Sequence, residues 1–198
     1  MNLLLLQPFA GVLVLVTALI LLLSRDWRVS ISALGAQYVG VLLLIMHYWP
    51  LEFAVVKLIA GWMGAAILGM GLAENASSWG EGMAGGYSGL MFRFLLAALM
   101  ALLVYSLIPQ AAVWFNRATY AHILAGLGLI GMGVLHFSLS VRPPRIVLAL
   151  LTALSGFEVL YATMETSLLI NALLAGLTLG IAFLGAYFCV APVMEERA

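Results

Sequence analysis

Seven long runs of apolar residues divide this chain, and they constrain its fold more than any other feature. A run of about 18 or more apolar residues can cross the hydrocarbon core of a bilayer as an α-helix. Of the 198 residues, 65% are hydrophobic and only 8% are charged, whereas a soluble domain carries about 25% charged residues. No segment alternates apolar and polar residues at period two, which disfavours a β-barrel. The sequence therefore predicts an all-α, polytopic transmembrane bundle with about seven spans, at residues 3–23, 30–48, 52–73, 88–108, 120–140, 145–163 and 167–190.

The composition also excludes several classes of function. The formal net charge is +0, which gives no basis for nucleic-acid binding. The single cysteine, Cys189, excludes an intrachain disulfide and a cysteine-based metal cluster. The chain shows no nucleophile–base pair and no nucleotide-binding loop, so we expect no cofactor, no metal and no catalysis by the chain alone. Residues 1–23 lack a basic start and an A-x-A cleavage site, and we expect them to be a retained span.

The distribution of basic residues predicts the orientation of the helices. When the seven spans alternate in direction, most arginines fall on one side of the membrane. The positive-inside rule then places the N-terminus outside and the C-terminus in the cytoplasm. The cytoplasmic side holds Arg25, Arg28, Arg93, Arg142, Arg145 and Arg197, and the outer side holds Arg117 and, just inside its span, Lys57.

A weak internal repeat is visible between residues 3–73 and 120–190. In both segments a span, an arginine-containing turn, a second span, a short break and a third span follow in the same order. The sequence thus suggests two parallel three-helix units within one membrane domain, linked by the helix at 88–108. Chance similarity between Leu/Ala/Gly-rich helices is the alternative. Small residues four positions apart predict close helix packing in the third helix of each unit, at Gly61, Ala65 and Gly69 and at Ala172, Gly176 and Gly180.

Glu158 stands inside the apolar run 145–163 and is the strongest candidate for a functional residue. It lies 13 residues after Arg145, which is roughly 20 Å along a helix. An ionisable residue at such a depth is costly, and by default it indicates a functional site. Desolvation disfavours its charged form unless a cation or hydrogen-bond donors offset the cost. We favour a proton or cation relay at Glu158 over a neutral or paired carboxyl group that only holds helices together.

Three further polar residues accompany Glu158 as relay candidates. Lys57 lies about one turn into its span and can be a buried partner for a carboxylate, a relay lysine, or a side chain that extends outward to the interface. Under the repeat, Asn171 falls one position from the equivalent of Lys57, so Lys57, Asn171 and Glu158 can share one depth. Gln37 lies nearer the middle of the membrane, where an interhelical hydrogen bond is the commoner role.

The histidines and the glycine-rich segment permit two further interpretations. His47 and His122 lie at outer span ends and His136 near an inner end, so His47 with His122 is the pair that could ligate a haem. Interfacial histidines are commoner than haem ligands, and we expect no haem in this protein. The glycines within residues 125–133 lie mid-span without a lysine, which indicates close helix packing rather than a phosphate-binding loop.

Residues 121–190 resemble the small three-helix subunit called K in bacterial complex I and C in Mrp-type cation/proton antiporters. That family has a span, an arginine-containing cytoplasmic turn, a second span with G-x-E in its interior, and a third span. Here the turn is 142–145 and the motif is Gly156-Phe157-Glu158. The resemblance implies that Glu158 occupies the position of the family's intramembrane proton-relay carboxylate. Residues 3–73 resemble the same unit more weakly, with Gln37 in place of the glutamate.

This sequence departs from the family at several points. The family unit stands alone at about half this length, and its third span carries a second buried carboxylate. Here the corresponding spans offer only Asn171 and Lys57, and Ala162 stands where an asparagine often follows the glutamate. Residues 121–163 also resemble an ATP-synthase proteolipid, although a rotor subunit has no use for five further, different spans.

The resemblance implies an integral subunit of a multi-subunit ion-translocating complex in the bacterial inner membrane. Its partners would be other membrane subunits and the lipid bilayer, and the assembly would be a redox- or ion-gradient-driven translocase. The relay set would be Glu158, Lys57, Gln37 and Asn171. The alternatives are a structural membrane subunit of an energy-transducing complex that moves no ions, and a small self-contained transporter.

Overall fold

The computed structural model describes residues 3–79 and 86–197, and every regular element in these ranges is helical. Six of the helices are long and apolar enough to cross a membrane, and the first helix has a shorter apolar part at Gln7–Leu23. The predicted all-α transmembrane bundle is therefore confirmed. The elements are α1 (Leu3–Leu23), α2 (Trp27–Ile45), α3 (Leu51–Glu74), the 3-10 helix η1 (Ala76–Trp79), α4 (Gly86–Trp114), α5 (Tyr120–Ser138), α6 (Pro143–Tyr161) and α7 (Leu168–Arg197).

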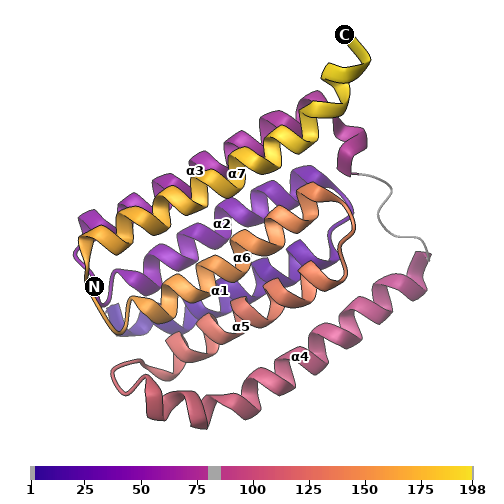
Figure 1. Cartoon of the computed structure of the whole chain (residues 1–198). Coiled ribbons are helices and arrows are strands. Elements are labelled where there is room, and N and C mark those ends of the chain that lie inside the picture. Colours follow the sequence, from indigo (N-terminus) through magenta and orange to yellow (C-terminus); the bar gives the residue numbers. More distant parts are fainter. Residues whose placement is uncertain (1–2, 80–85, 198) are drawn as a thin grey trace.

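The helices run alternately in opposite directions and form a layered bundle (Figure 1). α3 and α7 lie side by side along one face, and α4 lies along the opposite face against α5. Between these faces α1 packs against α2 and α5, and α6 packs against α5 and α7. Two pairs of helices that correspond in the predicted repeat pack against each other, α1 with α5 and α3 with α7. The internal repeat itself stays a prediction.

Pro50 and Pro143 lie at helix starts, whereas Pro8 and Pro109 lie inside α1 and α4. Pro50 is the N-cap of α3, and Pro143 occupies the first turn of α6, where the missing N–H group costs nothing. The span predicted at 88–108 stops just before Pro109, but in the structure Pro109 lies inside α4, which continues to Trp114. An apolar membrane helix tolerates an internal proline because neighbouring groups can satisfy the freed carbonyl. The predicted loop 74–87 contains η1, and its part at 80–85 lies outside the described residues.

Glycines bring α5 and α6 into close contact, as the sequence predicted for residues 125–133. A Cβ atom at Gly133 would lie 2.6 Å from the backbone nitrogen of Ala153. A Cβ at Gly156 would lie 2.6 Å from the carbonyl oxygen of Gly126. Any larger side chain at these positions would push the two backbones apart, so the glycines set the distance between the helix that holds Glu158 and its neighbour.

The prediction of close packing is confirmed for α3, where a Cβ at Gly61 would collide with the Tyr38 ring of α2 and Ala65 is buried, but for α7 it was wrong in its register. Gly176 and Gly180 are exposed, and a Cβ atom added at either position would have no neighbour within 4 Å, so they do not form the contact. The helices instead meet where Gly64 faces Ala182 and Gly71 faces Ala186, with a Cβ at Gly71 only 3.2 Å from the Ala186 backbone. The small-residue spacing is the same, but it lies on the neighbouring stripe of α7. The stripe at 176 and 180 faces the surroundings of the bundle.

Much of the outer surface is apolar, as a helix in contact with lipid requires. On α4, the side chains of Met91, Leu95 and Leu102 are 75%, 66% and 68% exposed. On α7, Leu169 and Leu173 are 73% and 67% exposed. Polar residues are found instead among the buried side chains, where Lys57, Glu158 and Gln37 are all within 1% of full burial. This distribution is that of an integral membrane protein whose site lies inside the bundle.

Candidate functional site

A buried ion pair between α3 and α6 forms the centre of the candidate site. The Nζ atom of Lys57 lies 2.6 Å from Oε1 of Glu158 and donates a hydrogen bond to it. Each side chain is only 1% exposed. α3 and α6 have few backbone contacts with each other, so the long lysine side chain provides most of the span between them. Two ionisable groups therefore share one desolvated place, and each offsets the burial cost of the other.

The position of each partner follows from its helix. Lys57 lies in the second turn of α3, which begins at Leu51, and so it is inside the span rather than at its end. Glu158 is in the last turn of α6, which ends at Tyr161. The two residues therefore lie at the same level of the bundle. The structure excludes the outward-extended conformation that we considered for Lys57, because its ammonium group faces the interior and binds a carboxylate.

Three hydroxyl groups surround the ion pair. Tyr38 of α2 is 1% exposed, and its hydroxyl lies near Ser155, Thr178 and the Glu158 carboxylate. Thr178 of α7 also lies near that carboxylate. Ser155 and Thr178 donate their own protons to the carbonyl groups of the preceding helical turn, at 2.8 and 3.0 Å. Their oxygens thus remain able to accept a hydrogen bond within the site.

Two polar atoms of this cluster have no hydrogen-bond partner among the described residues. They are Oε2 of Glu158 and the hydroxyl of Tyr38. A carboxyl group that is protonated on Oε2 becomes a donor, and an acceptor hydroxyl is already near. The pair can therefore exist as ammonium and carboxylate or as amine and carboxylic acid with little movement of the side chains. The arrangement can hold, release and re-accept one proton between α3 and α6.

The other two predicted relay residues are buried but are not joined to the ion pair. Gln37 is fully buried, and neither atom of its amide has a hydrogen-bond partner in the described part of the chain. Asn171 is 3% exposed and donates from Nδ2 to the carbonyl of Phe53 at 3.4 Å. Because Phe53 lies one turn before Lys57 on α3, Asn171 flanks the pair at about the expected depth. Its Oδ1 atom has no partner among the described residues.

Tyr38 is the member of the site that the sequence reasoning missed. It follows Gln37 directly, and a tyrosine inside an apolar run is usually interfacial. The signal that could have found it is Gly61, because a Cβ at that position would collide with the Tyr38 ring. Gly61 was assigned to helix contact, whereas it makes room for an aromatic ring from α2. The consequence is that the Tyr38 hydroxyl reaches past α3 toward Glu158 and Thr178.

The histidines do not assemble a haem site in the described residues. His47 and His122 are close, with ring centroids 5.9 Å apart. However, both ring nitrogens of His122 are engaged, one with the Leu44 carbonyl at 3.0 Å and one with the Thr119 hydroxyl at 2.6 Å. A carbonyl oxygen can only accept, so Nε2 of His122 donates to it. His136 lies at the other end of α5 and is 1% exposed.

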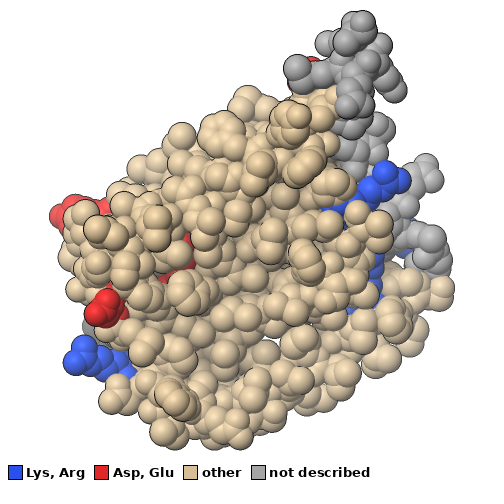
Figure 2. All heavy atoms as spheres, in the orientation of Figure 1, with Lys and Arg blue, Asp and Glu red and all other residues tan. Residues whose placement is uncertain are grey.

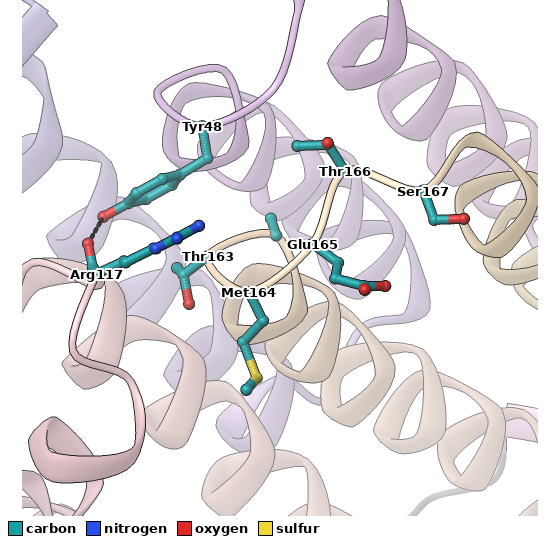
Figure 3. Close-up of a pocket in the computed structure, with 8 residues that line it drawn as sticks. Tyr48, Arg117, Thr163, Met164, Glu165, Thr166 and Ser167 are labelled. Atoms are coloured by element: carbon teal, nitrogen blue, oxygen red, sulfur yellow. Dashed lines mark hydrogen bonds between the residues drawn. The ribbon is translucent and has the colours of Figure 1, made fainter.

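A surface pocket of about 550 Å³ lies at the end of the bundle where α6 passes into α7. Its lining includes Tyr48, Arg117, Thr163 and Glu165 (Figure 3). The Arg117 side chain extends into the pocket beside the Tyr48 ring, whereas the Glu165 carboxylate points away from it. The Tyr48 hydroxyl donates to the Arg117 carbonyl at 2.8 Å and so ties the loop before α5 to the end of α2. The pocket is a polar opening on the side that we predicted to be outer.

No group of three or more potential metal ligands occurs among the described residues. Comparison of the chain with models of protein families, with curated proteins and with solved structures gives no match. The functional argument therefore depends on the buried cluster itself.

Proposed function

We propose that this chain is a membrane subunit of a proton- or cation-translocating complex related to complex I and the Mrp antiporters, in which Glu158 and Lys57 act as a relay pair. The observation that carries the proposal is their 2.6 Å contact inside an apolar bundle. Ionisable residues at such depth are rare and commonly mark ion or proton pathways. The surrounding hydroxyls of Tyr38, Ser155 and Thr178 offer further hydrogen-bonding groups for a proton that leaves the pair.

The relay works by alternating the charge of the pair. With both groups ionised, Lys57 and Glu158 form a closed contact. Uptake of a proton by Glu158 leaves Lys57 without its counter-charge, which favours loss of the lysine proton toward a second group. Gln37 and Asn171 lie buried on the neighbouring helices α2 and α7 and are the nearest predicted extensions of such a path. The complex resides in the bacterial inner membrane, with the N-terminus outside and partner subunits around the exposed apolar faces.

The test is ion flux in inside-out membrane vesicles that contain the intact complex. Acidification would be followed with a pH-sensitive dye during NADH oxidation, and its collapse would be followed on addition of Na⁺ or K⁺. We expect Glu158→Gln to abolish most of the coupled flux because it keeps shape and hydrogen bonding but removes the titration. Glu158→Asp should keep part of it. Glu52→Gln is the matched control, because Glu52 is an exposed carboxylate near the start of α3.

If the pair has only a structural role, the expected result is different. Replacing both partners by apolar residues of similar volume, as in Lys57→Met with Glu158→Met, should then preserve assembly and flux together. Under the relay proposal the same double variant assembles but does not translocate. Full flux in Glu158→Gln or in the double variant refutes the relay and leaves a structural subunit of an energy-transducing complex as the function.

A further inference from the structure

A second buried cationic group lies at the opposite end of α6 from the ion pair. Arg145 is in the first turn of α6 and yet is only 2% exposed. Its Nε, Nη1 and Nη2 atoms have no hydrogen-bond partner among the described residues. The guanidinium carbon lies 4.3 Å from the centroid of the Trp79 ring. Trp79 is itself held in place, because its Nε1 donates to the Arg25 carbonyl at 2.8 Å.

Two other basic side chains lie close to Arg145. Arg93 of α4 and His136 of α5 both interact electrostatically with it across the interior. Arg93 donates to the Leu22 carbonyl at 3.1 Å, which orients it toward the same end of the bundle. His136 is 1% exposed, and neither ring nitrogen has a hydrogen-bond partner in the described part of the chain. Basic groups from α4, α5 and α6 therefore converge.

A negative charge near these basic groups would offset the cost of burying them. No carboxylate of the described residues pairs with Arg145, since Glu158 is engaged with Lys57. The N-terminus of α6 carries partial positive charge, which disfavours a cation there in addition to the cost of its burial. A desolvated guanidinium whose donors are unused is costly unless an anion supplies acceptors. Its planar set of donors matches the oxygens of a phosphate in a bidentate manner, and His136 can add one more donor.

We propose that Arg145, His136 and Trp79 form a binding site for a phosphate group, supplied by the headgroup of an anionic phospholipid. The site lies at the end of the bundle where α5 passes into α6, and Figure 2 shows Lys and Arg atoms gathered at that end of the visible face. Basic pockets between membrane helices on the cytoplasmic side bind anionic headgroups in this way.

The test is lipid binding by the purified full-length protein in neutral detergent. The melting temperature would be measured against increasing short-chain phosphatidylglycerol, phosphatidylcholine or inorganic phosphate. We expect phosphatidylglycerol to raise it well beyond phosphatidylcholine, and Arg145→Met to weaken the apparent affinity by about tenfold or more, because a charge-assisted bidentate contact is lost. Arg145→Lys, which keeps the charge but not the fork, should weaken it less. Arg142→Met is the control, because Arg142 is an exposed arginine three residues away.

Three results overturn the proposal. Equal stabilisation of Arg145→Met and the unchanged protein by phosphatidylglycerol excludes Arg145 as the ligand. A response to inorganic phosphate as large as that to phosphatidylglycerol excludes a lipid source. The third concerns Glu81, which lies two residues after Trp79 in the sequence but outside the described residues. If Glu81→Gln and Arg145→Met lower the melting temperature equally and no lipid changes it, the counter-charge comes from the chain itself. None of these results depends on the relay at Glu158.

Discussion

The buried ion pair predicts a strong energetic coupling between positions 57 and 158. At a separation of 2.6 Å and an effective dielectric constant of about 20, two unit charges attract each other by about 6 kcal/mol. Desolvation of both groups offsets most of this attraction, so the pair adds little to stability compared with apolar residues. Removal of one partner is different, because it leaves a buried charge without compensation. We expect Lys57→Met or Glu158→Met alone to cost about 3–5 kcal/mol.

The double variant should recover much of that loss. With both side chains replaced by methionine, no buried charge remains and the volume is nearly conserved. We expect it to be more stable than either single variant by about 2–4 kcal/mol. The assay is equilibrium unfolding of the purified protein in mixed micelles, with increasing SDS fraction and helicity as the signal. A cycle of Lys57→Met with Glu52→Met is the control, because Glu52 is exposed and its effect should add within about 0.5 kcal/mol.

Additivity at positions 57 and 158 would refute this reasoning. If the double variant is destabilised by the sum of the two single variants, then neither charge is left uncompensated when the other is removed. The 2.6 Å contact would in that case have no energetic role, and water or another group would satisfy each partner separately. The relay proposal would lose its physical basis together with the coupling.

Two other predictions follow from packing and from orientation. Gly156→Ala should lower stability by about 1–3 kcal/mol, because its Cβ would meet the Gly126 carbonyl at 2.6 Å, whereas Gly176→Ala should be neutral or slightly stabilising, as judged by the same unfolding assay. In a Cys189→Ser background, cysteines at the exposed positions 142 and 117 should react with an impermeant maleimide from opposite sides of the membrane; labelling of both from one side would contradict the alternating helices.

The sequence predicted the number and nature of the helices well because one physical requirement dominates them. A bilayer demands about 20 apolar residues per helix, and the seven runs meet that length almost without interruption. Helix ends were less accurate. The span predicted at 88–108 stops just before Pro109, where the proline removes a helical hydrogen bond, but α4 continues to Trp114.

The site was predictable in its residue types but not in its partners. Glu158 and Lys57 stood out because charges inside apolar runs are rare. Their contact depends on the rotation of α3 and α6 about their own axes, and a stripe of small residues does not determine that rotation. The same ambiguity produced the error at Gly176 and Gly180, where the correct spacing was assigned to the wrong face. Tyr38 was missed because its ring fits inside the bundle only where Gly61, on a different helix, leaves room for it. The sequence around Tyr38 does not show this room.

Tyr38 offers the sharpest separation between a role in stability and a role in transfer. Its hydroxyl is buried beside Ser155, Thr178 and Glu158, yet it has no hydrogen-bond partner among the described residues. Removal of an unsatisfied buried hydroxyl costs little, so Tyr38→Phe should change the unfolding free energy by less than about 1 kcal/mol. If a proton passes between Glu158 and the hydroxyls, the same variant should slow coupled flux severalfold while the complex assembles normally. Ser155→Ala, which leaves the Tyr38 hydroxyl in place, should have the smaller effect. Unchanged flux in Tyr38→Phe would show that the proton leaves the ion pair by another route, for which Asn171 would be the next residue to replace.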